Sequence, residues 1–127
     1  MVTDRPAGLG IKANILWLYY RDLEAALRFQ VDKLSSGLLV DQGFAKVMAA
    51  SRSGFVGLVD GAQGLHPFTE RKAVRVELEV DAPAAWNAIL ARRGVAVEPA
   101  AGEGGVPAFL DAGSYLFQFR RGQISTY

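Results

Sequence analysis

Cysteine is absent from this chain of 127 residues, and histidine occurs once, as His66. The lack of cysteine excludes disulfides, thiolate metal sites and cysteine nucleophiles. No GxSxG segment is present, so a Ser-His-Asp triad would have to use His66 without a recognisable nucleophile motif. His66 lies in a segment with glycine and proline but no orienting partner. It is therefore predicted to be a surface residue rather than a general base on a lid.

The chain also lacks an excess of charge and a long apolar run. Its 14 basic and 13 acidic residues give a net charge of +1, which provides no electrostatic reason to expect nucleic acid or an anionic membrane as a partner. The longest apolar run, Ile15 to Tyr20, is too short to cross a bilayer. The polar start, Met1 to Gly10, does not resemble a signal peptide. We therefore expect a cytoplasmic protein without a nucleic-acid or membrane partner.

The first half of the sequence predicts one strand, one helix and three further strands. Residues 14–21 are β-branched and aromatic, which is typical of a buried strand. Asp22 is suited to cap the helix that follows, and Gly37 to end it in a left-handed conformation. Gln30 interrupts the apolar stripe of this helix and needs a hydrogen-bond partner if it is buried. The three further strands are predicted at 38–41, 44–50 and 55–59.

The second half repeats this order after a linker at about 61–71. Residues 72–81 alternate between polar and apolar, as in a half-buried strand. Residues 81–94 predict a helix with Pro83 in its first turn and Gly94 at its end. Strands are then predicted at 95–98, 106–110 and 115–120.

The two halves can be aligned by their helices, because Asp22 and Ala82 open them at an offset of 60 residues. Equal element order in two halves of similar length indicates duplication. The sequence thus predicts a single α+β domain over 1–127. Module one covers about 12–60 and module two about 72–122.

The segments ILWLYYRDLEAALRF, FVGLVDG, LEVDAPAAW and GSYLFQF carry a family resemblance. In pattern and spacing they resemble the vicinal oxygen chelate superfamily, which includes glyoxalase I, extradiol dioxygenases and the bleomycin- and fosfomycin-resistance proteins. The resemblance spans roughly residues 13–120. It implies two βαβββ modules that form a curled mixed sheet around a cavity. Whether the modules pair within one chain or by exchange between chains stays open.

The resemblance also identifies where a divalent metal would be held in that superfamily. The matching positions in this chain are Ile15, Gly57, Arg75 and Gln118. Only Gln118 offers an oxygen, whereas such a site needs three or four oxygen or nitrogen ligands. We therefore expect neither a metal nor any other cofactor.

Strand alternation predicts which side chains face the cavity. In the first strand Leu16, Leu18 and Tyr20 would pack on the helix, which turns Ile15, Trp17 and Tyr19 toward the cavity. In the second module Arg75, Glu77 and Glu79 would face inward, as would Leu116, Gln118 and Arg120 of the last strand. The predicted ligand-binding residues are Trp17, Tyr19, Arg75, Glu77 and Gln118. Aromatic faces beside an arginine suit a planar or acidic organic ligand, with Arg75 as its anchor.

Two helices cannot bury all of the aromatic residues, which number two Trp, four Tyr and seven Phe. Trp17, Tyr19 and Phe44 are among those expected to remain uncovered, and large exposed apolar patches usually mark an interface. The sequence therefore predicts a homodimer.

Three functions are compatible with this pattern. The first is a metal-free binder of a small organic molecule. The second is a lyase or isomerase that uses Glu77 or Glu79 as a general base, which a raised carboxylate pKa would favour. The third is a regulatory or structural module whose cavity is filled by its own side chains. The sequence alone does not decide whether the protein is an enzyme.

Overall fold

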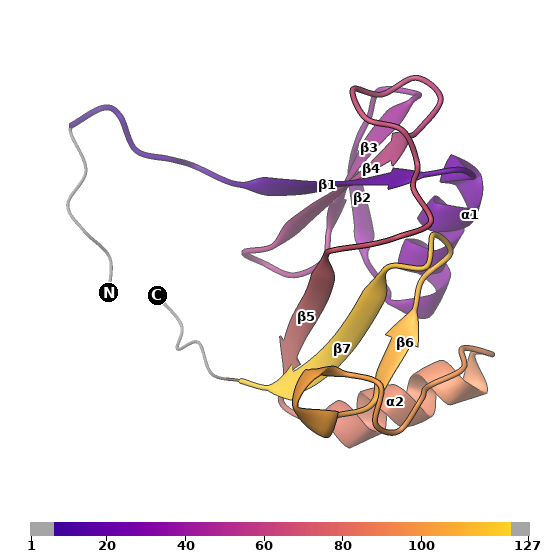
Figure 1. The fold of residues 1–127 in the computed structure, drawn as a ribbon. Coiled ribbons are helices and arrows are strands. Elements are labelled where there is room, and N and C mark those ends of the chain that lie inside the picture. Colours follow the sequence, from indigo (N-terminus) through magenta and orange to yellow (C-terminus); the bar gives the residue numbers. More distant parts are fainter. Residues whose placement is uncertain (1–6, 123–127) are drawn as a thin grey trace.

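The computed structural model describes residues 7–122 and shows two modules that share one order of elements (Figure 1). Module one consists of β1 (Ile15–Tyr20), α1 (Leu23–Arg28), η1 (Phe29–Lys33), β2 (Gly37–Asp41), β3 (Ala45–Ala49) and β4 (Phe55–Asp60). Module two consists of β5 (Arg75–Val80), α2 (Pro83–Arg92), η2 (Glu103–Gly105), β6 (Ala108–Leu110) and β7 (Leu116–Arg121). The α+β class is confirmed, and so is the order of elements, except that module two has two strands after its helix where module one has three.

The first helix begins as predicted and ends earlier than predicted. The Asp22 carboxylate accepts a hydrogen bond from the backbone N–H of Ala25 at 3.1 Å, so it caps α1. The helix continues into the π-helical turn η1 and stops at Lys33. The left-handed residue that follows is therefore Ser35, with φ 59°, and not Gly37, which opens β2.

The two sheets have related topologies. In module one the order is β1-β4-β3-β2, and β1 runs parallel to β4. In module two it is β5-β7-β6, and β5 runs parallel to β7. The strand predicted at 95–98 is reduced to one bridge between Glu98 and Ala108. Pro99 and Pro107 flank this bridge, and proline has no N–H with which to extend the ladder.

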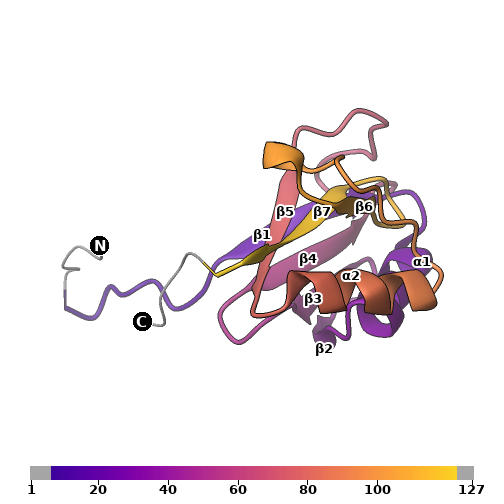
Figure 2. The ribbon, with the colours of Figure 1, turned by 90° about the horizontal axis from the view of Figure 1, so that it is seen from below.

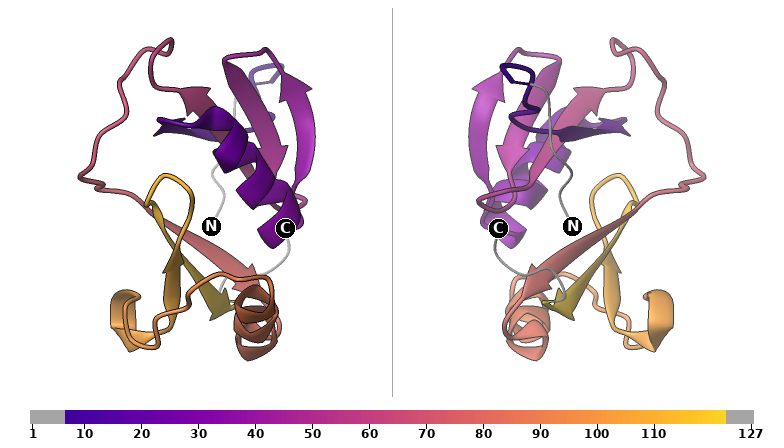
Figure 3. Two further views of the ribbon diagram at one scale, coloured as in Figure 1. Left: turned by 90° about the vertical axis from the view of Figure 1, so that its right-hand side faces the viewer. Right: turned by 90° about the vertical axis from the view of Figure 1, so that its left-hand side faces the viewer.

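One apolar core joins the helix-covered faces of both sheets. Leu18 and Leu58 of module one and Phe117 and Phe119 of module two are buried in the same cluster. The strands form two separate mixed sheets, one in each module (Figure 3). The outer face of each sheet points away from the shared core.

Hydrogen bonds across the shared core fix the modules to each other, and we call Tyr20, Asp111 and Tyr115 the inter-module seam. The Tyr20 hydroxyl donates to Asp111 Oδ2 at 2.5 Å, and Asp111 Oδ1 accepts from the backbone N–H groups of Gly113 and Tyr115. Burial raises the pKa of Tyr20 and of Asp111 above their ordinary values. The Tyr115 hydroxyl accepts a hydrogen bond from the backbone N–H of Tyr19 at 2.9 Å and donates one to the Tyr19 carbonyl at 3.2 Å.

The end of α2 lies beside the end of the first helix, which adds a second link between the modules (Figure 2). Lys33 Nζ donates to the carbonyl of Arg93 at 2.5 Å, and Arg93 Nη1 donates to the carbonyl of Lys33 at 2.7 Å. Gln30 is buried nearby in sequence, where its Oε1 accepts from the Ser36 hydroxyl at 3.0 Å while its Nε2 has no partner. The hydrogen bonds between Lys33 and Arg93 therefore help to fix the orientation of one module relative to the other.

Candidate ligand-binding site

The outer face of β1 presents apolar and aromatic side chains. Leu18 and Tyr20 are buried in the core, whereas Ile15 and Trp17 are exposed on the opposite side. Leu16 was predicted to pack on the helix but is 43% exposed, because the core begins only at Leu18. Tyr19 is half-buried, and the exposed His66 ring stands edge-on against it with the centroids 5.4 Å apart. His66 is thus on the surface, as predicted.

Trp17 lies flat against the sheet because its neighbour on β4 has no side chain. Trp17 pairs in register with Gly57, and a Cβ at residue 57 would lie 2.0 Å from Cε3 of the indole ring. The ring therefore fills the place of a side chain on β4. Gly57 is also one of the four positions that match metal ligands in the resemblance, and this position offers no donor atom.

In module two, a network of charged and polar side chains covers the equivalent face. Glu77 Oε1 accepts three hydrogen bonds, from Arg75 Nη1 at 3.0 Å, from Gln118 Nε2 at 2.9 Å and from Arg120 Nε at 2.9 Å. Gln118 is fully buried, and its Oε1 accepts from the backbone N–H of Glu103 at 2.9 Å. The structure thus brings together three of the predicted ligand-binding residues, Arg75, Glu77 and Gln118.

The network determines the acidity of Glu77. Hydrogen bonds from Arg120, and then from Gln118 and Arg75, hold the pKa of the Glu77 carboxyl below its usual range. A general base working near neutral pH is more effective with a raised carboxyl pKa, so this environment does not favour Glu77 as a base. Glu79 is half-buried on β5, where it pairs in register with Arg120.

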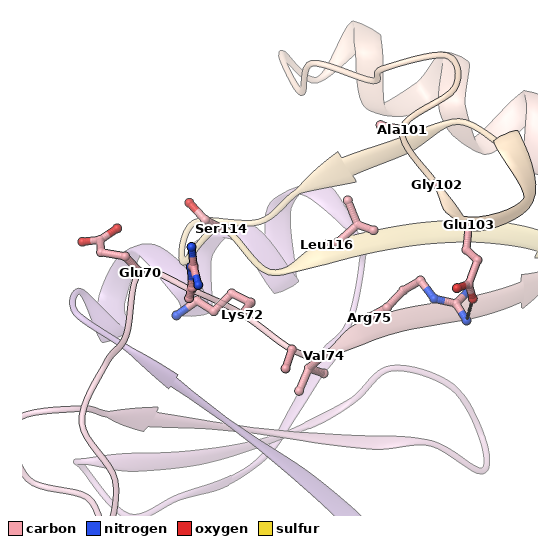
Figure 4. Close-up of a pocket in the computed structure, with 11 residues that line it drawn as sticks. Glu70, Lys72, Val74, Arg75, Ala101, Gly102, Glu103, Ser114 and Leu116 are labelled. Atoms are coloured by element: carbon pink, nitrogen blue, oxygen red, sulfur yellow. Dashed lines mark ion pairs between the residues drawn. The ribbon is translucent and has the colours of Figure 1, made fainter.

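A groove of about 810 Å³ lies beside this network (Figure 4). It is lined by the end of the linker, the start of β5, the loop before η2 and the start of β7. Arg75 lines it together with Glu103, Val74 and Leu116. At its other end, Lys72 Nζ lies 3.8 Å from the centroid of the Phe68 ring and 4.4 Å from that of Tyr115. The groove therefore combines cationic groups with a partly apolar lining.

Trp17 and Tyr19 do not line this groove, and they lie on the other sheet. Both outer faces point away from the shared core, so the expected cavity with one aromatic wall and one charged wall is not enclosed by the described part of one chain. Sequence alternation assigned these side chains to the correct faces of their strands. It could not show how the two sheets are oriented.

The sequence reasoning missed Glu103 and Asp111. No pattern in the sequence links Glu103 to Arg75, which lies 28 residues earlier. In the structure Glu103 Oε2 is 2.6 Å from Arg75 Nη2. Asp111 precedes a turn, and its burial depends on Tyr20 from the other module. Contacts between segments so far apart have no local signal.

The donor atoms present do not suit the divalent metal of the superfamily. Ile15, Gly57 and Arg75 offer no ligand atom, and the amide of Gln118 is engaged on both sides by Glu77 and Glu103. Within residues 7–122, no group of three or more histidine, aspartate or glutamate side chains is placed to hold a metal ion. No helix in the described part of the chain has the length and apolar character of a membrane span.

Solved structures resemble this fold, although no protein-family profile and no curated protein matches the sequence. TnmS3, an antibiotic binding protein from Streptomyces sp. CB03234, is 22% identical, with a TM-score of 0.71 over 91% of this chain and 98% of that chain. The fosfomycin resistance protein FosX from Mesorhizobium loti is 18% identical, with a TM-score of 0.63 over 91% and 94%.

A glyoxalase/bleomycin resistance protein from Streptomyces sp. CB03234 is 22% identical, with a TM-score of 0.64 over 87% of this chain and 100% of that chain. At such identities the likeness concerns the fold, because proteins that share a fold differ widely in function. The chain therefore shares the fold of these proteins, and the glyoxalase/bleomycin-resistance fold is the one that the sequence resemblance predicted.

Proposed function

We propose that this protein binds a small organic molecule without a metal, at a site that a homodimer completes. The observation that carries the proposal is the separation of the two outer faces. Trp17 offers a flat, exposed aromatic surface on one sheet, and Arg75, Glu77 and Gln118 form a polar wall on the other. A ligand that contacts both needs the aromatic face of one copy opposite the polar wall of another.

The exposed apolar residues support a second copy as the occupant of the first face. They lie on the two edge strands of the module-one sheet, β1 and β2, and in the turn before β3, and they include Ile15, Trp17, Leu38, Leu39, Val40 and Phe44. An apolar surface of this kind is unfavourable in water and usually marks an interface. The polar wall of the same chain faces away from Trp17. A second copy can cover the apolar face of the first and place its polar wall opposite Trp17.

The similarity to an antibiotic binding protein supports binding rather than catalysis as the activity. A base at Glu77 has no support, because its pKa is lowered and its carboxylate is held by three donors. The ligand that this site favours has a planar apolar body that can stack on Trp17.

The test is a thermal-shift screen of planar aromatic compounds, combined with light scattering of the free protein. Binding to the folded state should raise Tm, and Trp17→Ala should weaken binding by about two- to tenfold through lost stacking. Leu65→Ala, at an exposed apolar residue of the linker, is the matched control and should bind normally. If no compound raises Tm, the filled-cavity module becomes the better interpretation.

Light scattering should return a mass near twice 13.7 kDa. A mass near 13.7 kDa at micromolar concentration would contradict the dimer.

Elemental analysis after dialysis should find no stoichiometric Zn, Ni, Fe or Mn. About one retained metal ion per chain would show that the site is not metal-free.

A further inference from the structure

The guanidinium of Arg75 lies in the groove and is bound by a carboxylate from a neighbouring loop. Glu103 Oε2 is 2.6 Å from Arg75 Nη2, and the two side chains are 71% and 34% exposed (Figure 4). Glu77 engages the other terminal nitrogen of Arg75, Nη1, at 3.0 Å. Arg75 is thus bound by two carboxylates, Glu77 on its own strand and Glu103 on the neighbouring loop.

The loop is fixed to the sheet by its backbone and not by this carboxylate. The N–H of Glu103 donates to the buried Oε1 of Gln118 at 2.9 Å, and its carbonyl accepts from Arg120 Nη2 at 3.1 Å. Gly102 permits the close approach, because a Cβ there would lie 2.8 Å from Gln118 Oε1. The Glu103 side chain can therefore leave Arg75 while the loop keeps its place.

Exchange of one carboxylate for another at Arg75 is energetically easy. Ion pairs with an exposed partner contribute little to stability, because water solvates the separated charges well. A planar guanidinium also matches a carboxylate from a ligand as well as it matches Glu103. Lys72 and Arg71 line the same groove and favour an anion, whereas Val74 and Leu116 offer apolar contact to its body.

We propose that Glu103 is a tethered competitor that occupies an anion-binding position on Arg75, and that the ligand is an organic acid whose carboxylate displaces it. This inference rests on the proposed binding of a small organic molecule and specifies its chemical class. The carboxylate of the ligand takes the place of Glu103 Oε2, while the Arg75–Glu77 contact is kept. Glu103 then returns to water, where it is already largely exposed.

The experiment compares 2-naphthoate with its neutral analogue 2-naphthamide, by ligand-observed NMR titration of the full chain. Glu103→Gln removes the charge and leaves the backbone contacts of the loop in place. It should tighten 2-naphthoate binding by about two- to fivefold and leave 2-naphthamide unchanged. Arg75→Gln should remove the preference for the acid over the amide. Glu98→Gln makes the same change of charge at a residue outside the groove and should behave as wild type.

The outcomes separate this inference from the proposed function. If wild type binds both compounds but Glu103→Gln fails to tighten 2-naphthoate, the tethered competitor is wrong and the binding site stands. The tethered competitor is equally wrong if Arg75→Gln keeps its preference for the acid. If neither compound binds wild type or Glu103→Gln at millimolar concentration, both proposals fail for aromatic ligands.

Discussion

The same position in the two modules carries opposite chemistry. On the outer face of module one, Trp17 of β1 pairs in register with Gly57 of β4, and the indole ring fills the space above the glycine. At the equivalent place in module two, Glu77 of β5 pairs with Gln118 of β7, and their side chains are joined by a hydrogen bond of 2.9 Å. One backbone arrangement thus supports an apolar surface in module one and a polar wall in module two.

This difference shows which positions of the two modules are free to differ. The inner faces of both modules contribute to one core, so their residues are constrained to be apolar and well packed. The outer faces have no such common partner within the described part of the chain, so packing does not hold their residues to one chemistry. Arg75 and Ile15, which occupy equivalent strand positions, illustrate the same divergence.

The largest effect on stability is expected at the inter-module seam, whose hydrogen bonds fix the two modules to each other. Asp111→Ala leaves the buried Tyr20 hydroxyl and the N–H groups of Gly113 and Tyr115 without their acceptor. The free energy of unfolding should fall by about 2–4 kcal/mol. Urea denaturation measures it. Asp60→Ala is the control, since Asp60 accepts from Ala62 N–H in an exposed turn, and it should cost below about 1 kcal/mol. Equal losses in the two variants would show that the seam does not hold the modules together.

A smaller effect is expected where Trp17 covers Gly57. In Gly57→Ala the new Cβ would overlap the indole ring, so Trp17 must leave its place and stability should drop by about 1–3 kcal/mol. Gly37→Ala provides the matched substitution in β2 of the same sheet, with no atom within 4 Å of the added carbon. Tryptophan fluorescence and thermal denaturation should change in the first variant and remain near wild type in the second. A silent Gly57→Ala would mean that the ring does not rest on the glycine.

The smallest effect is expected on the polar wall, and it depends on pH. Because the folded state lowers the pKa of Glu77, the unfolded chain takes up the proton first as pH falls through the usual value of 4.5. The stabilisation from Glu77 is therefore complete above that pH and is lost as pH falls through the lower, folded pKa. Glu77→Gln should reduce stability by about 1 kcal/mol at neutral pH and differ less from wild type in acid.

Denaturation of wild type and Glu77→Gln at several pH values between neutral and strongly acidic provides the measurement. Glu24→Gln, at an exposed glutamate of α1, is the control and should follow wild type throughout. A constant difference between Glu77→Gln and wild type at every pH would contradict a lowered Glu77 pKa.

The sequence by itself determined the two modules, the order of their elements and the face of each strand to which Trp17 and Glu77 belong. These features follow from local rules, namely the alternation of side chains along a strand, the helical period and caps such as Asp22. Local rules also gave errors within one or two residues of helix ends, as at Ser35, where a π-helical turn shifted the left-handed position.

Only the tertiary structure decided that the helix-covered faces share a core and that the outer faces point apart. It also placed Glu103 on Arg75 and buried Asp111 under Tyr20. These contacts join residues far apart in the chain. Their energy comes from burial and pairing that exist only once the modules have docked, so no window of sequence contains them.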